Sequence, residues 1–137
     1  MNITEINGCV IVPTYNNEKT LARVLDGVLE LVPADRLIVI NDGATDSTPK
    51  ILEKFAESIH ILVNDSNQGK GFALRKGIKK AIELGFDNAI TIDSDGQHFA
   101  SDIPNFIAEI QNEPNSLLIE PESVSFGVCS FGVKILK

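Results

Sequence analysis

Short apolar runs alternate with amphipathic stretches along most of the chain. Apolar residues dominate four runs, which is typical of strands buried on both faces of a parallel sheet; the runs span residues 9–12, 37–40, 59–63 and 89–92. Between and after them, apolar residues recur at helical spacing in stretches that begin near residues 18, 47, 70 and 101. This alternation predicts one α/β domain whose mainly parallel sheet is covered by helices on both faces.

The predicted helices carry recognisable start and stop signals. In the second helix Asp46 or Ser47 can provide the N-terminal cap, and Pro49 lies in the first turn. The third helix is expected to bury an apolar stripe that includes Phe72 and Ile82. Gly85 follows that stripe and is expected to end the helix.

The C-terminal part of the chain departs from this pattern. A fifth strand is expected at residues 116–119, and the domain is expected to span residues 1–119. In the tail, residues 120–137, the four-residue segment 125–128 recurs at 130–133. Its near-alternating pattern is compatible with an edge strand, and non-native sequence explains it equally well. Both interpretations stay open, and neither assigns chemistry to the tail.

Composition and charge narrow the class of protein. The chain has 137 residues, 43% hydrophobic and 23% charged, which excludes a fibrous or wholly disordered protein. Nineteen acidic against twelve basic residues give a net charge of −7, the wrong sign for a nucleic-acid partner. Phosphate groups would therefore have to be bound by a local feature, such as a cation, the start of a helix or backbone N–H groups. The two distant cysteines are interpreted as reduced core thiols, and without a signal peptide or bilayer-spanning run we expect a cytoplasmic protein.

Polar residues follow three of the predicted strands. Residues 13–16, 41–43 and 93–96 stand at strand ends, and the loop 67–71 leads into the third helix. In an open parallel sheet, ligands bind beyond the carboxyl ends of the strands. We therefore expect these four segments to converge on one rim of the sheet.

Asp93 and Asp95 are the sharpest candidates for chemistry. Residues two apart in an extended segment point the same way, so both carboxylates can face one point. Like charges at that range repel unless a cation joins them. Mg²⁺ or Mn²⁺ held by one or two carboxylates together with substrate phosphates satisfies this requirement. The alternative is an ordinary solvated turn.

Three other positions admit a functional and a structural interpretation. Asp42 could accept hydrogen bonds from a base or sugar, or simply belong to a turn. Lys70, between two glycines, could approach a phosphate at a helix start, or the glycines could form only a turn. The ring of Tyr15 could stack on a base or pack half-buried against the protein.

Four segments together resemble a known family. Residues 10–18 (VIVPTYNNE), 39–48 (VINDGATDST), 67–77 (NQGKGFALRKG) and 93–104, with DSDGQH and DIP, match its motifs in order. They resemble the family-two inverting glycosyltransferases with the GT-A fold, in particular the branch related to dolichyl-phosphate mannosyltransferases. The resemblance extends over residues 9–119 and implies a Rossmann-like nucleotide-diphospho-sugar transferase fold, here truncated.

The resemblance implies a role for each matching position around the nucleotide. Pro13 and Tyr15 would flank the base, Glu18 would reach the same pocket, and Asp42 would hydrogen-bond the base. Lys70 would lie near the nucleotide.

The fourth motif would serve the diphosphate and the sugar. Asp93 would meet the ribose or the metal, Asp95 would bind the divalent ion, and Gln97 would approach the donor sugar. Ser94, between the two aspartates, belongs to the same set. The donor would be a UDP- or GDP-linked sugar, and the acceptor a lipid phosphate or a polysaccharide.

The sequence also departs from the family pattern. Asn41 replaces the first Asp of the usual pair and Ala44 the usual Ser. The family continues beyond this point with an acceptor site and, in many members, a general base, and no residue here is identified as that base. We therefore expect a donor-binding portion with weak or absent turnover, associated with a membrane only in a longer form.

Two alternatives remain at this stage. A phosphohydrolase of haloacid-dehalogenase type would use Asp93 as nucleophile and Asp95 as acid. A non-catalytic nucleotide-binding domain would be kept for contacts within a homodimer.

Overall fold

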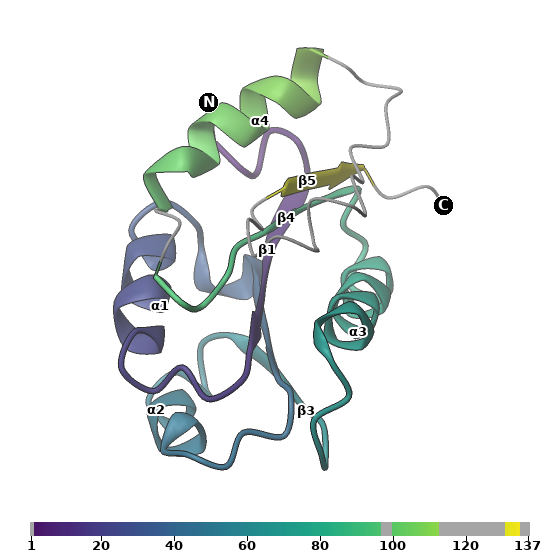
Figure 1. The fold of residues 1–137 in the computed structure, drawn as a ribbon. Helices are drawn as coiled ribbons and strands as arrows, with labels where there is room; N and C mark the ends of the chain where they lie inside the picture. The colour runs from purple at the N-terminus through teal and green to yellow at the C-terminus, as the bar shows by residue number, and fades with distance from the viewer. Residues whose placement is uncertain (1, 97–99, 113–130, 135–137) are drawn as a thin grey trace.

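The computed structural model describes residues 2–96, 100–112 and 131–134. These residues form a five-stranded sheet in the order β3-β2-β1-β4-β5 (Figure 1). The first four strands are parallel, and β5 pairs antiparallel with β4 at the edge. The strands span Gly8–Thr14 (β1), Leu37–Asn41 (β2), His60–Val63 (β3), Asn88–Thr91 (β4) and Phe131–Lys134 (β5).

Helices cover both faces of this sheet, as the sequence pattern predicts. Helices α1, α2 and α4 pack on one face and α3 on the other (Figure 1). The helices span Leu21–Leu29 (α1), Thr48–Glu53 (α2), Lys70–Glu83 (α3) and Ile103–Asn112 (α4), with short 3₁₀ turns at Ala34–Arg36 and Ala100–Asp102. None of the helices in these described segments is long and apolar enough to cross a membrane.

The core has two halves because successive strand residues point to opposite faces. Val10 and Val12 of β1 face α1 and α4, whereas Cys9 and Ile11 face α3. Burial raises the pKa of the Cys9 thiol to about 12, against a smaller lowering by the guanidinium of Arg36. Cys9 is thus a buried free thiol, as expected; Cys129 lies outside the described residues.

Helix α3 differs from the prediction in the width of its buried stripe. Ala73, Leu74 and Ala81 are buried, but Phe72 is 42% and Ile82 44% exposed. The prediction that both are buried is wrong, because the buried face of α3, which packs on β1 and β2, is narrower than the predicted stripe. The helix itself ends at Glu83, and Gly85 follows its C-cap with a φ of +86°, as predicted for the residue that stops it.

The ends of two other elements can be compared with the sequence. Ser47 precedes α2 without making a side-chain cap, whereas Asp46 Oδ1 accepts a hydrogen bond from the Thr48 N–H at 2.9 Å. Asp46 is therefore the residue of the two candidates that binds the start of α2. Residues 131–134 form an edge strand, as one interpretation of the tail predicts. The strand expected at residues 116–119 lies outside the described residues.

Candidate functional site

A cleft of about 430 Å³ lies beyond the carboxyl ends of the central strands. The chain adds β2 and β3 on one side of β1 and then crosses to β4 on the other side, which is the arrangement that opens a crevice in parallel sheets. All four predicted segments contribute, so their convergence is confirmed. The lining residues are Pro13, Thr14, Tyr15, Asn17, Asp42, Asn67, Gly69, Lys70, Ala73, Asp93, Ser94 and Asp95.

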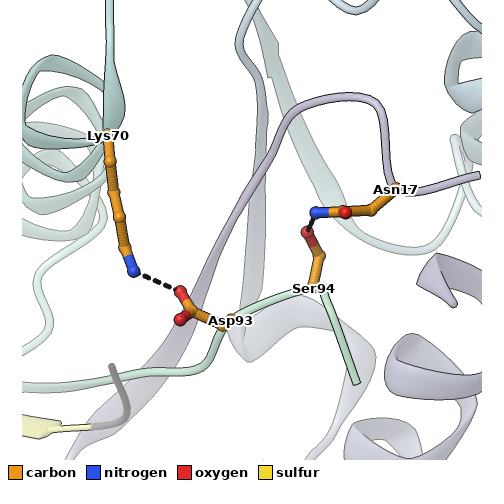
Figure 2. A network of polar contacts seen from close by, with 4 residues as sticks. All are labelled: Asn17, Lys70, Asp93 and Ser94. Atoms are coloured by element: carbon orange, nitrogen blue, oxygen red, sulfur yellow. Dashed lines mark hydrogen bonds and ion pairs between the residues drawn. The ribbon is translucent and has the colours of Figure 1, made fainter. Parts of the chain in front are cut away.

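An ion pair crosses this cleft. Lys70, the first residue of α3, places its Nζ 2.5 Å from Oδ1 of Asp93, just beyond β4 (Figure 2). The Asp93 side chain is only 11% exposed and that of Lys70 30% exposed. A carboxylate this deeply buried needs a positive partner nearby, and α3 supplies it from the opposite side of the cleft.

Ser94 fixes the turn that carries the two aspartates. Its hydroxyl accepts a hydrogen bond of 2.6 Å from Nδ2 of Asn17 (Figure 2). Its carbonyl oxygen accepts one of 2.5 Å from the hydroxyl of Thr20. Ser94 is 1% exposed, so it lies beneath the surface and ties the Asp93–Asp95 turn to the segment that follows β1.

Asp42 is buried and holds the loop that leads into α3. Its Oδ1 accepts hydrogen bonds from Nδ2 of Asn64 and the N–H of Gln68, and its Oδ2 accepts one from the N–H of Gly69, each at 2.9 Å. The ammonium of Lys76 in turn donates to Oδ1 of Asn64 at 2.6 Å. The chain of contacts from Lys76 through Asn64 to Asp42 therefore sets the position of Gly69, immediately before Lys70.

The same loop lies against Gly43, which explains the glycine at that position. Gly43 has a φ of +71°, and a Cβ atom there would lie 2.4 Å from the carbonyl carbon of Ser66. Both the backbone angle and the close approach exclude other residues.

Two pairs of hydrogen bonds join the segment after β1 to the segment before α2. Asn16 Oδ1 accepts from the N–H of Thr45 at 2.8 Å, and its Nδ2 donates to the Thr45 hydroxyl at 3.2 Å. Glu18 accepts from the N–H of Ser47 at 2.8 Å, while Asp46 accepts from the N–H of Glu18 at 3.1 Å. These reciprocal pairs hold the two segments in a fixed relation.

The pKa of Asp46 reflects this network. Partial desolvation of the carboxylate raises it, but hydrogen bonds from the N–H groups of Thr48 and Glu18 outweigh that effect. The pKa of Asp46 therefore lies below its ordinary value. The folded protein therefore favours the ionised form of the Asp46 carboxyl group.

The predicted site residues do not all share the cleft. Tyr15 lines it and is 41% exposed, so part of its ring surface is accessible to a ligand. Glu18 is not among the lining residues, and its carboxylate is directed at the start of α2 instead. Gln97 lies outside the described residues.

Asp93 and Asp95 are the candidate ligands for a metal ion. Both carboxylates line one cleft, and no group of three or more His, Cys, Asp or Glu side chains within the described ranges is placed to hold an ion. Hard oxygen donors limited to one or two carboxylates suit Mg²⁺ or Mn²⁺ that completes its coordination with phosphate oxygens and water. The residues present fit such an ion.

Sequence reasoning missed the residues that support the site. Asn17 and Thr20 fasten Ser94, and Asn64 and Lys76 fasten Asp42. Asn17 and Lys76 stand inside segments that match the family motifs, which is the signal that could have singled them out. The partners of the others are distant in sequence, and no spacing rule connects them.

A comparison with known families identifies the chain. The model of "Glycosyl transferase family 2" matches residues 9–121. The chain belongs to this family. Its four motifs, which converge on the cleft, all lie inside the matched range, and the comparisons give no support to a phosphohydrolase or a non-catalytic domain.

Two similar proteins carry a nucleotide-linked sugar in their names or structures. The UDP-N-acetylglucosamine–dolichyl-phosphate N-acetylglucosaminyltransferase of Methanococcus voltae is 33% identical over 125 residues, covering 80% of this chain and 49% of the relative. S. aureus TarS in complex with UDP-GlcNAc is 26% identical with a TM-score of 0.61, covering 78% and 32% of the two chains.

A third similar protein supports the fold. The mannosyltransferase PcManGT from Pyrobaculum calidifontis, solved with GDP-Man and Mn²⁺, has a TM-score of 0.65 and 24% identity, covering 88% of this chain and 37% of that one. The GT-A architecture expected from the sequence is thus confirmed. The chain spans about half the length of the curated relatives it matches.

Proposed function

We propose that this chain holds the donor site of a glycosyltransferase and binds a nucleoside-diphosphate sugar together with Mg²⁺ or Mn²⁺. One observation carries the proposal: Tyr15, Lys70 and the aspartates at 93 and 95 line a single cleft at the carboxyl ends of parallel strands. These groups match the three parts of such a donor, which are an aromatic base, an anionic diphosphate and a bridging cation.

The base and the diphosphate would lie at different ends of the cleft. Pro13 and the partly exposed ring of Tyr15 offer a surface on which a base can stack. Lys70 and the first N–H groups of α3, a helix of 14 residues, offer positive charge to the diphosphate. Asp42 holds the loop before α3, and so it positions both Lys70 and the N–H groups at the start of that helix.

Asp95 and Asp93 would hold the metal, which supplies positive charge that stabilises the departing nucleoside diphosphate. The contacts of Ser94 keep the turn with both carboxylates in place. Gln97, by family resemblance, would approach the sugar. In our proposal an acceptor attacks the anomeric carbon with inversion, and the bond to the diphosphate breaks.

We propose a lipid-linked phosphate as the acceptor class, because the M. voltae relative is named as a transferase to dolichyl phosphate. The acceptor would approach the sugar end of the cleft, where the turn at Asp93–Asp95 ends. The donor half of the proposal can be tested without an acceptor.

Calorimetry with UDP and with GDP, each with and without Mn²⁺, tests the donor site directly. We expect one of the two nucleotides to bind in a metal-dependent manner. Asp95→Asn should weaken that binding at least about tenfold, which corresponds to the loss of roughly 1.4 kcal/mol. Asp26→Asn, a matched change of an exposed aspartate on α1, should leave it unchanged. Equal affinity in wild type and Asp95→Asn would refute the assignment.

A further inference from the structure

We infer that Lys70 is the counter-ion of Asp93 in the donor-free protein. When donor and metal bind, the ammonium of Lys70 leaves Asp93 and pairs with the diphosphate. This inference rests on the proposed function and adds a role that links the two ligands. It predicts that metal and nucleotide bind with positive coupling, and that Lys70 is a source of that coupling.

The first step of the argument is the contact itself. The ammonium of Lys70 lies 2.5 Å from Oδ1 of Asp93, a carboxylate whose side chain is 11% exposed. Removing positive charge from beside a buried carboxylate is unfavourable. The ammonium and a divalent cation would therefore compete for Asp93.

The second step concerns which part can move. The turn after Asp93 is held where Asn17 donates to Ser94 (Figure 2). The backbone before Lys70 is held where Asp42 accepts the N–H of Gly69. Between these fixed points lies a flexible side chain of four methylene groups, 30% exposed, whose ammonium can reorient once a second anion replaces Asp93 as its partner. The ammonium of Lys70 is therefore the charge that we infer to move between the two partners.

The third step concerns where the ammonium goes. A bound diphosphate brings negative charge to the cleft beside the start of α3, within reach of Lys70. Once the ammonium pairs with a phosphate oxygen, Asp93 is available to a metal. Each ligand therefore favours the other, and by linkage the effect is reciprocal. In donor-free protein, Lys70 should lower the affinity for the metal.

Lys70→Met separates this role from simple phosphate binding, because the affinities for metal and for nucleotide should change in opposite directions. With less positive charge at Asp93, Mn²⁺ alone should bind about five- to tenfold more tightly than to wild type. UDP or GDP, whichever wild type binds, should bind more weakly. Lys70→Arg should restore both affinities toward wild type, since it keeps the charge. Lys79→Met, an exposed lysine on the same helix, is the matched control and should change neither.

Calorimetric titrations of Mn²⁺ alone, of nucleotide alone and of each in the presence of the other give the coupling factor for every variant. General damage to the cleft would weaken both ligands, so tighter Mn²⁺ binding in Lys70→Met supports the inference. Mn²⁺ affinity that is unchanged, reduced or undetectable in Lys70→Met overturns it. If wild type binds neither UDP nor GDP, the proposed function fails, whereas the titrations with Mn²⁺ alone still decide whether Lys70 competes for Asp93.

Discussion

Gly77 of α3 lies directly against Ile11 of β1. A Cβ atom at position 77 would come within 2.6 Å of Cγ2 of Ile11 and within 2.8 Å of Cδ1 of Ile40. The absent side chain therefore sets how closely α3 approaches the sheet. Because Lys70 is on the same helix, this distance also sets how far the ammonium reaches across the cleft.

Gly77→Ala should destabilise the protein by about 1–3 kcal/mol, since the added methyl group forces α3 away from a packed sheet. Gly71→Ala is the matched control on the same helix, because a Cβ atom there meets nothing within 4 Å. That change should be neutral or stabilising by about 0.5–1 kcal/mol. Urea unfolding followed by circular dichroism measures both. Equal effects of the two substitutions would mean that the close approach of α3 contributes nothing.

Asn64→Ala should loosen the loop that leads into α3. The change removes a hydrogen bond from Asp42 and one from Lys76, both at a site where Asn64 is 6% exposed. A loss of about 1–3 kcal/mol in unfolding free energy is expected for buried polar groups left with fewer partners. Hydrogen exchange at the N–H groups of Gln68 and Gly69 should become faster, because both donate to Asp42.

The exposed Asn112, at the end of α4, provides the control for that experiment. Asn112→Ala should change neither the stability nor the exchange of Gln68 and Gly69. If Asn64→Ala left the exchange of these two N–H groups as slow as in wild type, Asp42 would hold the loop without help from Asn64.

Asp46 should make the stability of the protein depend on acidic pH. Because its pKa is lower in the folded protein than in the unfolded chain, the ionised carboxylate stabilises the fold. This contribution is complete above the unfolded pKa of about 3.9 and is lost as the pH falls through the folded value. The stability difference between wild type and Asp46→Asn should therefore shrink below about pH 4. Urea unfolding at a series of pH values tests this, and a constant difference would contradict it.

The framework of the site follows from the sequence because its signals are local. Buried parallel strands are short apolar runs, and the residues that end them, such as Asp42 and Asp93, are adjacent to those runs. The rule that ligands bind at the carboxyl ends of parallel strands then brings distant motifs together. That reasoning places Tyr15, Asp42, Lys70 and Asp95 on one cleft, and the structure agrees.

The supporting contacts could not be predicted, because they join residues far apart in sequence. Asn17 and Ser94 are separated by 77 positions, and Asn16 and Thr45 by 29. Which amide meets which hydroxyl depends on how the loops bend after their strands, and hydrophobic periodicity contains no information about this. The exposure of Phe72 could not be predicted for a related reason. Periodicity shows which side of a helix is apolar, but not how much of that side the sheet covers.

Glu18 illustrates how a residue of a recognised motif can make a contact that the resemblance does not indicate. The resemblance implies that its carboxylate reaches the base pocket, yet it accepts the N–H of Ser47 at the start of α2. Its contribution in this structure is to the arrangement of the loops around the cleft. The role of Glu18 toward a nucleotide stays a prediction.

The left-handed backbone of Asn16 restricts which amino acids this position can accept. Its φ of +51° favours glycine, asparagine or aspartate. Its side chain must also supply an acceptor to one group of Thr45 and a donor to another. Glycine offers neither and ionised aspartate lacks the donor, so asparagine meets these demands better than either. In a library of all substitutions at position 16, asparagine is therefore expected to be the best-tolerated residue.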